Sequence, residues 1–523
     1  MSEDFLKSHL QVLAHDSLFG RGTGQKGSRI TADYLYDFYS SDSFSSAELE
    51  ILRQPFSLEG VFWDAVEYTV YSPDGEDTQY LSETQLFPGG NAGFYPVLGG
   101  SGSVDAPVVF AGFSSTDQIF KSIDPKHPDI ENAWVMVFEQ NFLIEHNDQQ
   151  AQTNYFDGRA DYVRSVLSRT DAEGIIFISE FGVQQWEELA VYMSQQLERP
   201  LGVGKGGVIR GGGYSSGTAV SIHPELAAEI LGYTRTAQLD SLRQAWSEYG
   251  DTVEPLVTGY YLRNNPVIYN RSFEEENILA IIPGVDPERS EEILLLSAHY
   301  DHMGLGEPDG RDDIVYSGAD DNASGTSVLL QIAEAFRLAA DQGYRPSRTI
   351  VFLHAAAEEW GLLGSRYYVQ NPVFPNNNIV ANVNVDMVGH IDNEYADDEK
   401  VEYIYIIGAG LISSGLQELV DQTNQASVNL ELDEKYNSTS HPLNLYRRSD
   451  HWAFGEQNIP FVFFFSGLHD NYHVPSDTAD RIVWPLLAER TKLVTELVWR
   501  LAEARDRPVV DQDRFENRRH PSR

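Results

Sequence analysis

Two adjacent glutamates, Glu358 and Glu359, stand in the stretch LHAAAEEWGLLGS, where an apolar run gives way to a segment punctuated by glycines. The run before them contains TIVFL, which is typical of a buried strand. A carboxylate buried at the end of a core strand costs free energy unless it is paired or binds a cation. The pair is therefore either a solvated loop end or part of a site that holds positive charge.

Four other apolar segments in the C-terminal half also end in side chains that can do chemistry. They are His299, Asp301 and His302 after ILLLSA; Asp320 and Asp321 in YSGADDNASG; Asp386 after VANVNV; and His469, Asp470, Tyr472 and His473 after IPFVFFFSG. Taken alone, a histidine at a strand end is usually a hydrogen-bonded structural residue, and an aspartate before a helix usually caps it. Because ligands bind beyond the carboxyl ends of the strands in open α/β sheets, we expect these side chains to gather at one edge.

The donor types indicate a metal site. So many carboxylates in one place would repel one another unless cations lay among them. Imidazoles and carboxylates without thiolates suit Zn²⁺, with Mn²⁺ or Co²⁺ as substitutes. The chain contains no cysteine, which excludes thiolate zinc sites, disulfides and cysteine nucleophiles.

The elements that must position these residues follow from the texture of the chain. From about residue 275, wholly apolar runs alternate with helical patterns, which predicts a mixed, mostly parallel central sheet flanked by helices. Short β-rich runs such as APVVFAGF and EGIIFISE fill the middle of the chain. We predict an N-terminal part of the main domain at 1–85, an inserted β-rich domain at 86–255, the main domain at 256–505 and a polar tail at 506–523.

The composition of the chain argues against two classes of function. With 37 basic against 79 acidic residues, the net charge of −42 argues against nucleic-acid binding and against docking on an anionic membrane. The sequence contains no run of about 18 apolar residues, so no membrane-spanning helix is predicted.

The stretch GVGKGG (202–207) fits the dinucleotide-binding pattern but continues into VIRGGGYSSG, which cannot be a helix, so a loop is expected there. The first residues, MSEDFLKSHL, lack the features of a signal peptide; we expect a secreted or periplasmic protein whose signal peptide has been removed, with a cytoplasmic protein as the alternative.

Five blocks, SAHYDHMG, SGADDNASG, AAAEEWGLLGS, NVDMVG and YHVPSDT, resemble the signature motifs of the M28 family of di-zinc aminopeptidases, in the family's order and with compatible spacings. The resemblance extends over roughly 257–500 and over the N-terminal stretch LAHDSLFGRGTGQKGSRITADYLYDFY. The β-rich insert is similar to a protease-associated (PA) domain in its strand pattern and in DAEGIIFI. The family resemblance implies an α/β fold of the zinc-exopeptidase type that acts on peptides with a free N-terminus; it says nothing of oligomeric state.

The resemblance also implies a set of metal ligands. His299 and Asp386 would hold one Zn²⁺, Glu359 and His473 would hold the other, and Asp321 would bridge the two ions.

The remaining roles are implied in the same way. Asp301 would hydrogen-bond the imidazole of His299 and fix its tautomer. Glu358 matches the general base, which accepts a proton from the attacking water and passes it to the leaving amine, and Tyr472 matches the group that stabilises the transition state. Asp320 would not be a ligand.

Several residues near these motifs have ordinary structural explanations. His302 and His354 are expected to be hydrogen-bonded structural histidines. In RRSDHWAF, either Ser449 or Asp450 is expected to cap a helix.

Three alternatives to an aminopeptidase stay open. A carboxypeptidase-like enzyme would need a basic group for the terminal carboxylate, and Arg447 or Arg448 is the candidate. A cyclase-like relative would hold a single zinc ion, which the full ligand set disfavours. A non-catalytic binding protein would have lost a ligand or the base, and none is missing here.

Overall fold

The computed structural model describes residues 2–74, 77–86, 93–98, 103–113, 123–139, 162–163, 166–179, 183, 186–187, 190, 202–205, 208–210, 218–248, 254–305, 314–395, 401–439, 441 and 443–511. The chain divides into two compact units, one made of Met1–Ser57 with Phe273–Arg523 and the other of Leu58–Ser272. The second unit is longer at both ends than the insert predicted at 86–255. The strands β1 (Glu50–Asp74) and β10 (Leu256–Ile282) each run from one unit into the other, so no loop marks the boundary.

The first unit contains a mixed sheet with the strand order β17, β16, β18, β15, β11, β14, β10. Its strands besides β10 are β11 (Ile293–His299), β14 (Thr349–Ala355), β15 (Ile379–Val385), β16 (Tyr403–Ile407), β17 (Glu431–Asp433) and β18 (Phe461–Phe465). β11 runs parallel to both β14 and β15, and β15 runs parallel to β18, whereas β10 and β16 are antiparallel to their neighbours β14 and β18. The predicted mixed, mostly parallel sheet is confirmed.

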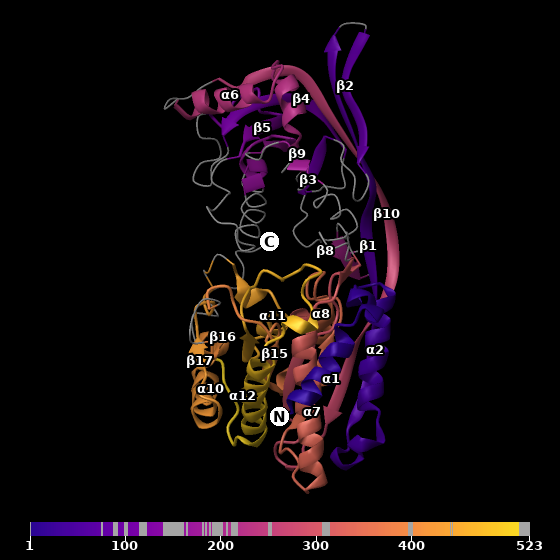
Figure 1. The fold of residues 1–523 in the computed structure, drawn as a ribbon, viewed down its shortest axis with the longest axis vertical. Coiled ribbons are helices and arrows are strands. Elements are labelled where there is room, and N and C mark those ends of the chain that lie inside the picture. The colour runs from indigo at the N-terminus through magenta and orange to yellow at the C-terminus, as the bar shows by residue number, and fades with distance from the viewer. Residues whose placement is uncertain are drawn as a thin grey trace. The chain divides into compact units, whose positions relative to one another are not determined.

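Helices cover the sheet, which explains why its central strands are buried along their whole length. The helices of this unit are α1 (Glu3–Leu13), α2 (Lys26–Tyr39), α7 (Gly325–Asp341), α8 (Leu363–Gln370), α9 (Ala409–Ile412), α10 (Ser414–Ser427), α11 (His451–Gly455) and α12 (Trp484–Glu503), with short helical turns η1 (Asp16–Arg21), η2 (Asp42–Ala47), η4 (Ala319–Ser324), η5 (Asn376–Asn378), η6 (Leu445–Arg447) and η7 (Ala479–Arg481). α7 and α12 pack on each other (Figure 1), and both pack on β11. Tyr368 of α8 and Phe454 of α11 join a core cluster with alternate residues of β11, such as Ile293 and Leu295.

The second unit has its own sheet and core. Its parallel strands are β4 (Val104–Phe113), β5 (Trp134–Phe138), β6 (Gly174–Ile178) and β9 (Thr218–Ile222), with β3 (Phe94–Leu98) antiparallel at the edge, and its other elements are β2 (Asp77–Leu86), β7 (Gly202–Lys205), β8 (Val208–Arg210), α5 (Pro224–Ile230) and α6 (Ala237–Glu248). The described part of GVGKGG is not a loop, because β7 pairs with β8 as an antiparallel hairpin. The similarity of the insert to a PA domain stays a prediction. None of the helices in the described part of the chain combines the length and apolar character needed to cross a membrane.

Packing of α2 against β14 buries a neutral histidine. His354 is completely buried, and its Nε2 lies 2.9 Å from the hydroxyl of Tyr39. Burial lowers the pKa of His354 from 6.5 to about 3. The sequence analysis expected a structural histidine at this position, and the contacts support that role.

This burial predicts a pH-dependent stability. Because the folded pKa is lowered, the unfolded chain binds one more proton than the folded chain between pH 6.5 and about 3, so the stabilisation is complete above pH 6.5 and is lost as the pH falls. The loss should be about 1.4 kcal/mol per pH unit well below pH 6.5. Urea titrations of the metal-free protein between pH 5 and 7.5 should show that His354→Gln has a shallower dependence than the unmodified chain. His15→Gln, at an exposed position, should not change the slope; equal slopes for all three proteins would contradict the prediction.

Candidate metal centre

The parallel strands of the first unit bring the predicted site residues to one edge of the sheet. His299 is the last residue of β11, Glu358 and Glu359 follow β14, and Asp386 follows β15 directly. Asp321 lies in η4, the turn before α7. His473 follows β18 after a short loop, so five separate segments contribute to one centre, as the sequence predicts.

One group of donors forms around His299. Its Nε2 lies 3.3 Å from Asp321 Oδ1, 3.3 Å from Asp386 Oδ1 and 4.0 Å from Glu358 Oε2. Burial opposes protonation of this imidazole, but the charges of Asp386 and Glu358 raise the pKa of His299 well above its ordinary value. His299 Nε2 and Asp386 Oδ1 are both buried and make no hydrogen bond within the described residues.

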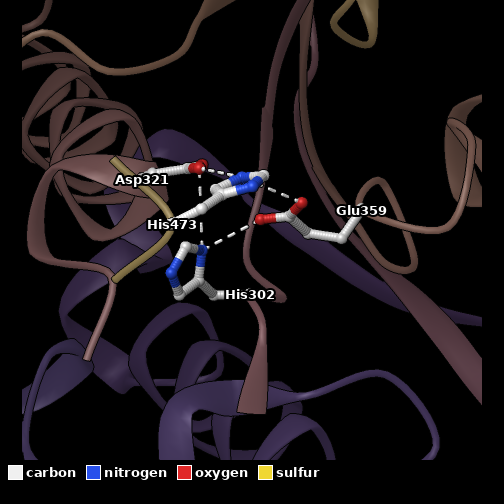
Figure 2. Close-up of side chains that lie close together, drawn as sticks. All are labelled: His302, Asp321, Glu359 and His473. Atoms are coloured by element: carbon white, nitrogen blue, oxygen red, sulfur yellow. Dashed lines mark hydrogen bonds and ion pairs between the residues drawn. The ribbon is translucent and has the colours of Figure 1, made fainter. Parts of the chain in front are cut away.

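A second group forms around His473 (Figure 2). His473 Nε2 lies 3.0 Å from Asp321 Oδ2 and 3.2 Å from Glu359 Oε2, and His302 Nδ1 lies 2.9 Å from Glu359 Oε1. Burial lowers the pKa of His473, but Glu359 and Asp321 more than offset this and raise it to about 9. Asp321 thus presents one carboxylate oxygen to each group, which is the arrangement that a bridging ligand requires.

The donors fit a pair of divalent cations. Two ligands bound to one tetrahedral Zn²⁺ at its usual bond lengths are about 3.3 Å apart, close to the spacing of the donors around His299 and His473. The buried atoms without hydrogen bonds point into the centre, where a cation would satisfy them. A cavity of about 30 Å³ adjoins the residues of both groups, enough space for at least one water molecule.

His302 belongs to the second group, although the sequence analysis assigned it an ordinary structural role. Its side chain is completely buried, its Nδ1 contacts Glu359, and its Nε2 has no hydrogen-bond partner in the described part of the chain. The motif SAHYDH carries a signal for this position, since His302 directly follows Asp301 in the same block. The motif alone does not distinguish a structural histidine from one that belongs to the metal centre.

Asp301 acts differently from the prediction. The Nδ1 of His299 lies 3.1 Å from the main-chain oxygen of Asp301 and 3.8 Å from its carboxylate, so the main chain and not the side chain holds the ring. The carboxylate instead accepts hydrogen bonds from the main-chain N–H groups of Glu358 and Glu359, at 3.0 and 3.3 Å. Through these two hydrogen bonds, Asp301 holds the backbone of the glutamate pair in place. Burial raises the pKa of its carboxyl group to about 7.

A buried polar chain supports Asp386. The hydroxyl of Ser449 donates to Asp386 Oδ2 at 2.7 Å, and the amide of Asn384 donates to Ser449 Oγ at 2.8 Å. Ser297 in turn donates to Asn384 Oδ1 at 2.6 Å. The prediction that Ser449 or Asp450 caps a helix through its side chain is wrong. The helix α11 begins at His451, and neither side chain forms a capping hydrogen bond at its N-terminus.

Tyr472 and Arg448 line the same cavity. Arg448 Nη2 donates to the hydroxyl of Tyr472 at 3.3 Å, and the Tyr472 ring stacks on His473 with 3.8 Å between centroids. Arg447 lies over the rings of Tyr446 and Trp452, at 4.7 and 5.0 Å, and does not line the cavity. The apolar part of the lining consists of Met387, Leu445, Phe463, Phe465 and Leu468.

Asp320, which the sequence analysis left out of the ligand set, lies in a neighbouring buried cluster. Its Oδ2 is 3.2 Å from His469 Nε2, whose ring stacks on His390. The main-chain N–H groups of Asp320 and Asp321 donate to the carboxylate of Asp477, at 2.9 and 3.0 Å. The cluster therefore fixes the turn that carries Asp321.

Comparisons with known proteins agree with the fold and the motifs. Residues 277–498 match the model of peptidase family M28. The chain is 29% identical to a probable leucine aminopeptidase of Arthroderma benhamiae, over 44% of this chain and 58% of that protein, and 28% identical to a probable aminopeptidase of Saccharomyces cerevisiae, over 40% and 53%. It thus spans less than two thirds of the length of these relatives.

Two solved structures share the fold. The aminopeptidase from Aneurinibacillus sp. strain AM-1 has a TM-score of 0.56 at 18% identity, covering 98% of this chain and 96% of that one. The zinc aminopeptidase BSAP from Bacillus subtilis has a TM-score of 0.53 at 16% identity, covering 98% of both chains. The α/β fold of the zinc-exopeptidase type predicted from the sequence is confirmed, because the chain shares its fold with these two aminopeptidases.

The support of Asp386 can be tested by removing one hydroxyl. Ser449→Ala leaves a buried carboxylate oxygen without its donor, and we expect the free energy of unfolding to fall by about 1.5–3 kcal/mol. Ser327→Ala is the matched control, because that buried hydroxyl donates to the neutral carbonyl of Ala323 at 2.7 Å and its loss should cost about 0.5–1.5 kcal/mol. Urea titration of both variants makes the comparison; a smaller loss for Ser449→Ala than for Ser327→Ala would contradict the assigned role.

Proposed function

We propose that the chain is a metal-dependent aminopeptidase that removes N-terminal residues from peptides with the help of two Zn²⁺ ions. The observation that carries this proposal is the carboxylate of Asp321, which faces both donor groups at once. His299 and Asp386 would hold one ion and Glu359 and His473 the other. When bound, such a pair of ions lowers the pKa of a shared water and polarises the substrate carbonyl.

Glu358 is the proposed general base. Its carboxylate lies beside the His299 group but farther from His299 Nε2 than the carboxylates of Asp321 and Asp386. Burial raises the pKa of Glu358 well above its ordinary value, as suits a group that takes up a proton and releases it again. It would accept the proton of the attacking water and pass it to the nitrogen of the departing peptide.

Tyr472 and the apolar lining would act on the substrate. The Tyr472 hydroxyl, which accepts from Arg448, can donate its own proton towards the oxygen that becomes negative in the transition state. Met387, Leu445 and Phe463 offer an apolar surface to the first side chain of the peptide. The surplus of carboxylates at the centre favours the charged amine of a free N-terminus.

Hydrolysis of leucine p-nitroanilide tests the proposal. We expect turnover that a chelator abolishes and Zn²⁺ restores, little turnover of the N-acetylated substrate, and weaker turnover of the glutamate analogue because the pocket is apolar and the centre acidic. Arg448 is the feature that favours the carboxypeptidase alternative. Release of C-terminal residues from N-blocked dipeptides, with no activity on free-amine substrates, would replace the present proposal with that one.

The role of Glu358 is tested by Glu358→Gln. We expect kcat to fall by about 10²–10⁴-fold, because the amide cannot accept the proton, while the zinc content of the protein stays the same. Glu334→Gln, on α7 in an ion pair with Arg337, is the control and should keep full turnover. Steady-state kinetics and metal analysis of both variants provide the measurements, and near-normal kcat in a zinc-loaded Glu358→Gln would refute the assignment.

A further inference from the structure

The turn GRGTG, residues 20–24, lies far from the metal-centre motifs in sequence but against them in space. Gly22 forms a parallel bridge with His302, and the main-chain oxygen of Arg21 accepts from the N–H of His302 at 3.3 Å. Gly20 has a φ of +62°, and a Cβ there would come within 2.2 Å of the main-chain oxygen of Gly304. The close approach of this turn to the ligand-bearing loop therefore depends on a glycine.

The side chain of Arg21 binds the main chain of two loops at once. It is 1% exposed, and its donors reach the carbonyl oxygens of Tyr300 at 2.8 Å, Leu13 at 2.5 Å, Ser317 at 2.6 Å, Gly318 at 2.8 Å and Asp321 at 3.4 Å. Tyr300 directly follows His299, and Gly318 directly precedes η4, which carries Asp321. One planar guanidinium thus joins the loop of the first histidine to the turn of the shared carboxylate.

Arg21 also places a positive charge beside the acidic centre. Burial lowers its pKa to about 10, and the nearby carboxylates of Asp477, Asp321 and Asp301 oppose this shift, so the group is charged at neutral pH. From the same turn, the hydroxyl of Thr23 donates to Asp301 Oδ2 at 2.9 Å. Asp301 in turn holds the main chain of Glu358 and Glu359.

We infer that the turn at residues 20–24 is a positioning element of the metal centre, with Arg21 fixing the distance between His299 and Asp321 and Thr23 fixing the glutamate pair through Asp301. This inference rests on the metal centre proposed above. The two loops belong to distant parts of the sequence, and Arg21 hydrogen-bonds to main-chain oxygens of both. Without the guanidinium of Arg21, the metal-binding atoms of His299 and Asp321 would no longer be held at the spacing that one ion needs.

The first experiment measures the dissociation constant of Zn²⁺ by competition with a chromophoric chelator. Arg21→Lys keeps the charge but cannot reach both loops, and we expect the dissociation constant to rise by about 10–100-fold. Arg348→Lys is the matched control, since Arg348 is also 1% exposed and donates to main-chain oxygens, those of Leu501 and Ala504, both at 2.6 Å. The zinc affinity of Arg348→Lys should stay within about twofold of that of the unmodified chain, even if its thermal stability falls as much as that of Arg21→Lys.

The second experiment uses a milder change, which decides the question if Arg21→Lys does not fold. Thr23→Val removes one hydroxyl and should also weaken zinc binding, whereas Thr31→Val, which removes a buried hydroxyl bonded to Gly27 O at 2.9 Å within α2, should not. Unchanged zinc affinity in Arg21→Lys and Thr23→Val would show that the turn is only structural and would overturn the inference. If the unmodified chain bound no zinc, the proposed function would fail first, and this inference with it.

Discussion

Mutual repulsion among buried carboxylates is the constraint on which this structure depends. Parallel strands end at a common edge and the turn η4 lies against it, so Asp321, Glu358, Glu359 and Asp386 meet within a few ångströms, almost entirely out of contact with solvent. Such a cluster is stable only if each negative charge is compensated. Imidazoles supply part of the compensation, the hydroxyl of Ser449 and the charge of Arg21 supply another part, and the remaining negative charge favours divalent cations.

Local backbone strain accompanies this arrangement. Ala357, Met387 and His473 all have positive φ angles, at 55°, 50° and 57°, which residues other than glycine rarely adopt. Each is a proposed ligand or base, or directly adjoins one. Strain of this kind costs of order 1–3 kcal/mol per residue and persists only where surrounding contacts enforce it. Here the strained residues lie in the segments that follow β14, β15 and β18, whose side chains meet at one centre.

The sequence predicts the parts of the centre that depend on strand direction. The apolar runs around His299, Glu359 and Asp386 identify buried parallel strands, and the common edge of such strands then brings the donors together. The sequence does not predict which atom of Asp301 contacts His299. The main-chain oxygen and the carboxylate oxygen lie at similar distances from His299 Nδ1, 3.1 and 3.8 Å. Contacts across the fold, such as Arg21 with Tyr300 O, leave no periodic pattern in the sequence. The division into two units falls inside β1 and β10, which continue through it without a turn, so no loop pattern in the sequence marks it.

The two neighbouring glutamates show how one anchor can serve two different tasks. Both N–H groups donate to the carboxylate of Asp301, so the main chain of the pair is fixed as a unit. The side chains then enter different surroundings. Glu359 contacts His302 and His473, and although burial opposes ionisation, these partners lower its pKa overall, as suits a metal ligand. Among the described residues, Glu358 makes no comparably close contact with an imidazole, and burial raises its pKa well above the ordinary value, as suits a group that exchanges protons. The difference between the two residues therefore comes from the partners around their side chains, since their backbone anchor is the same.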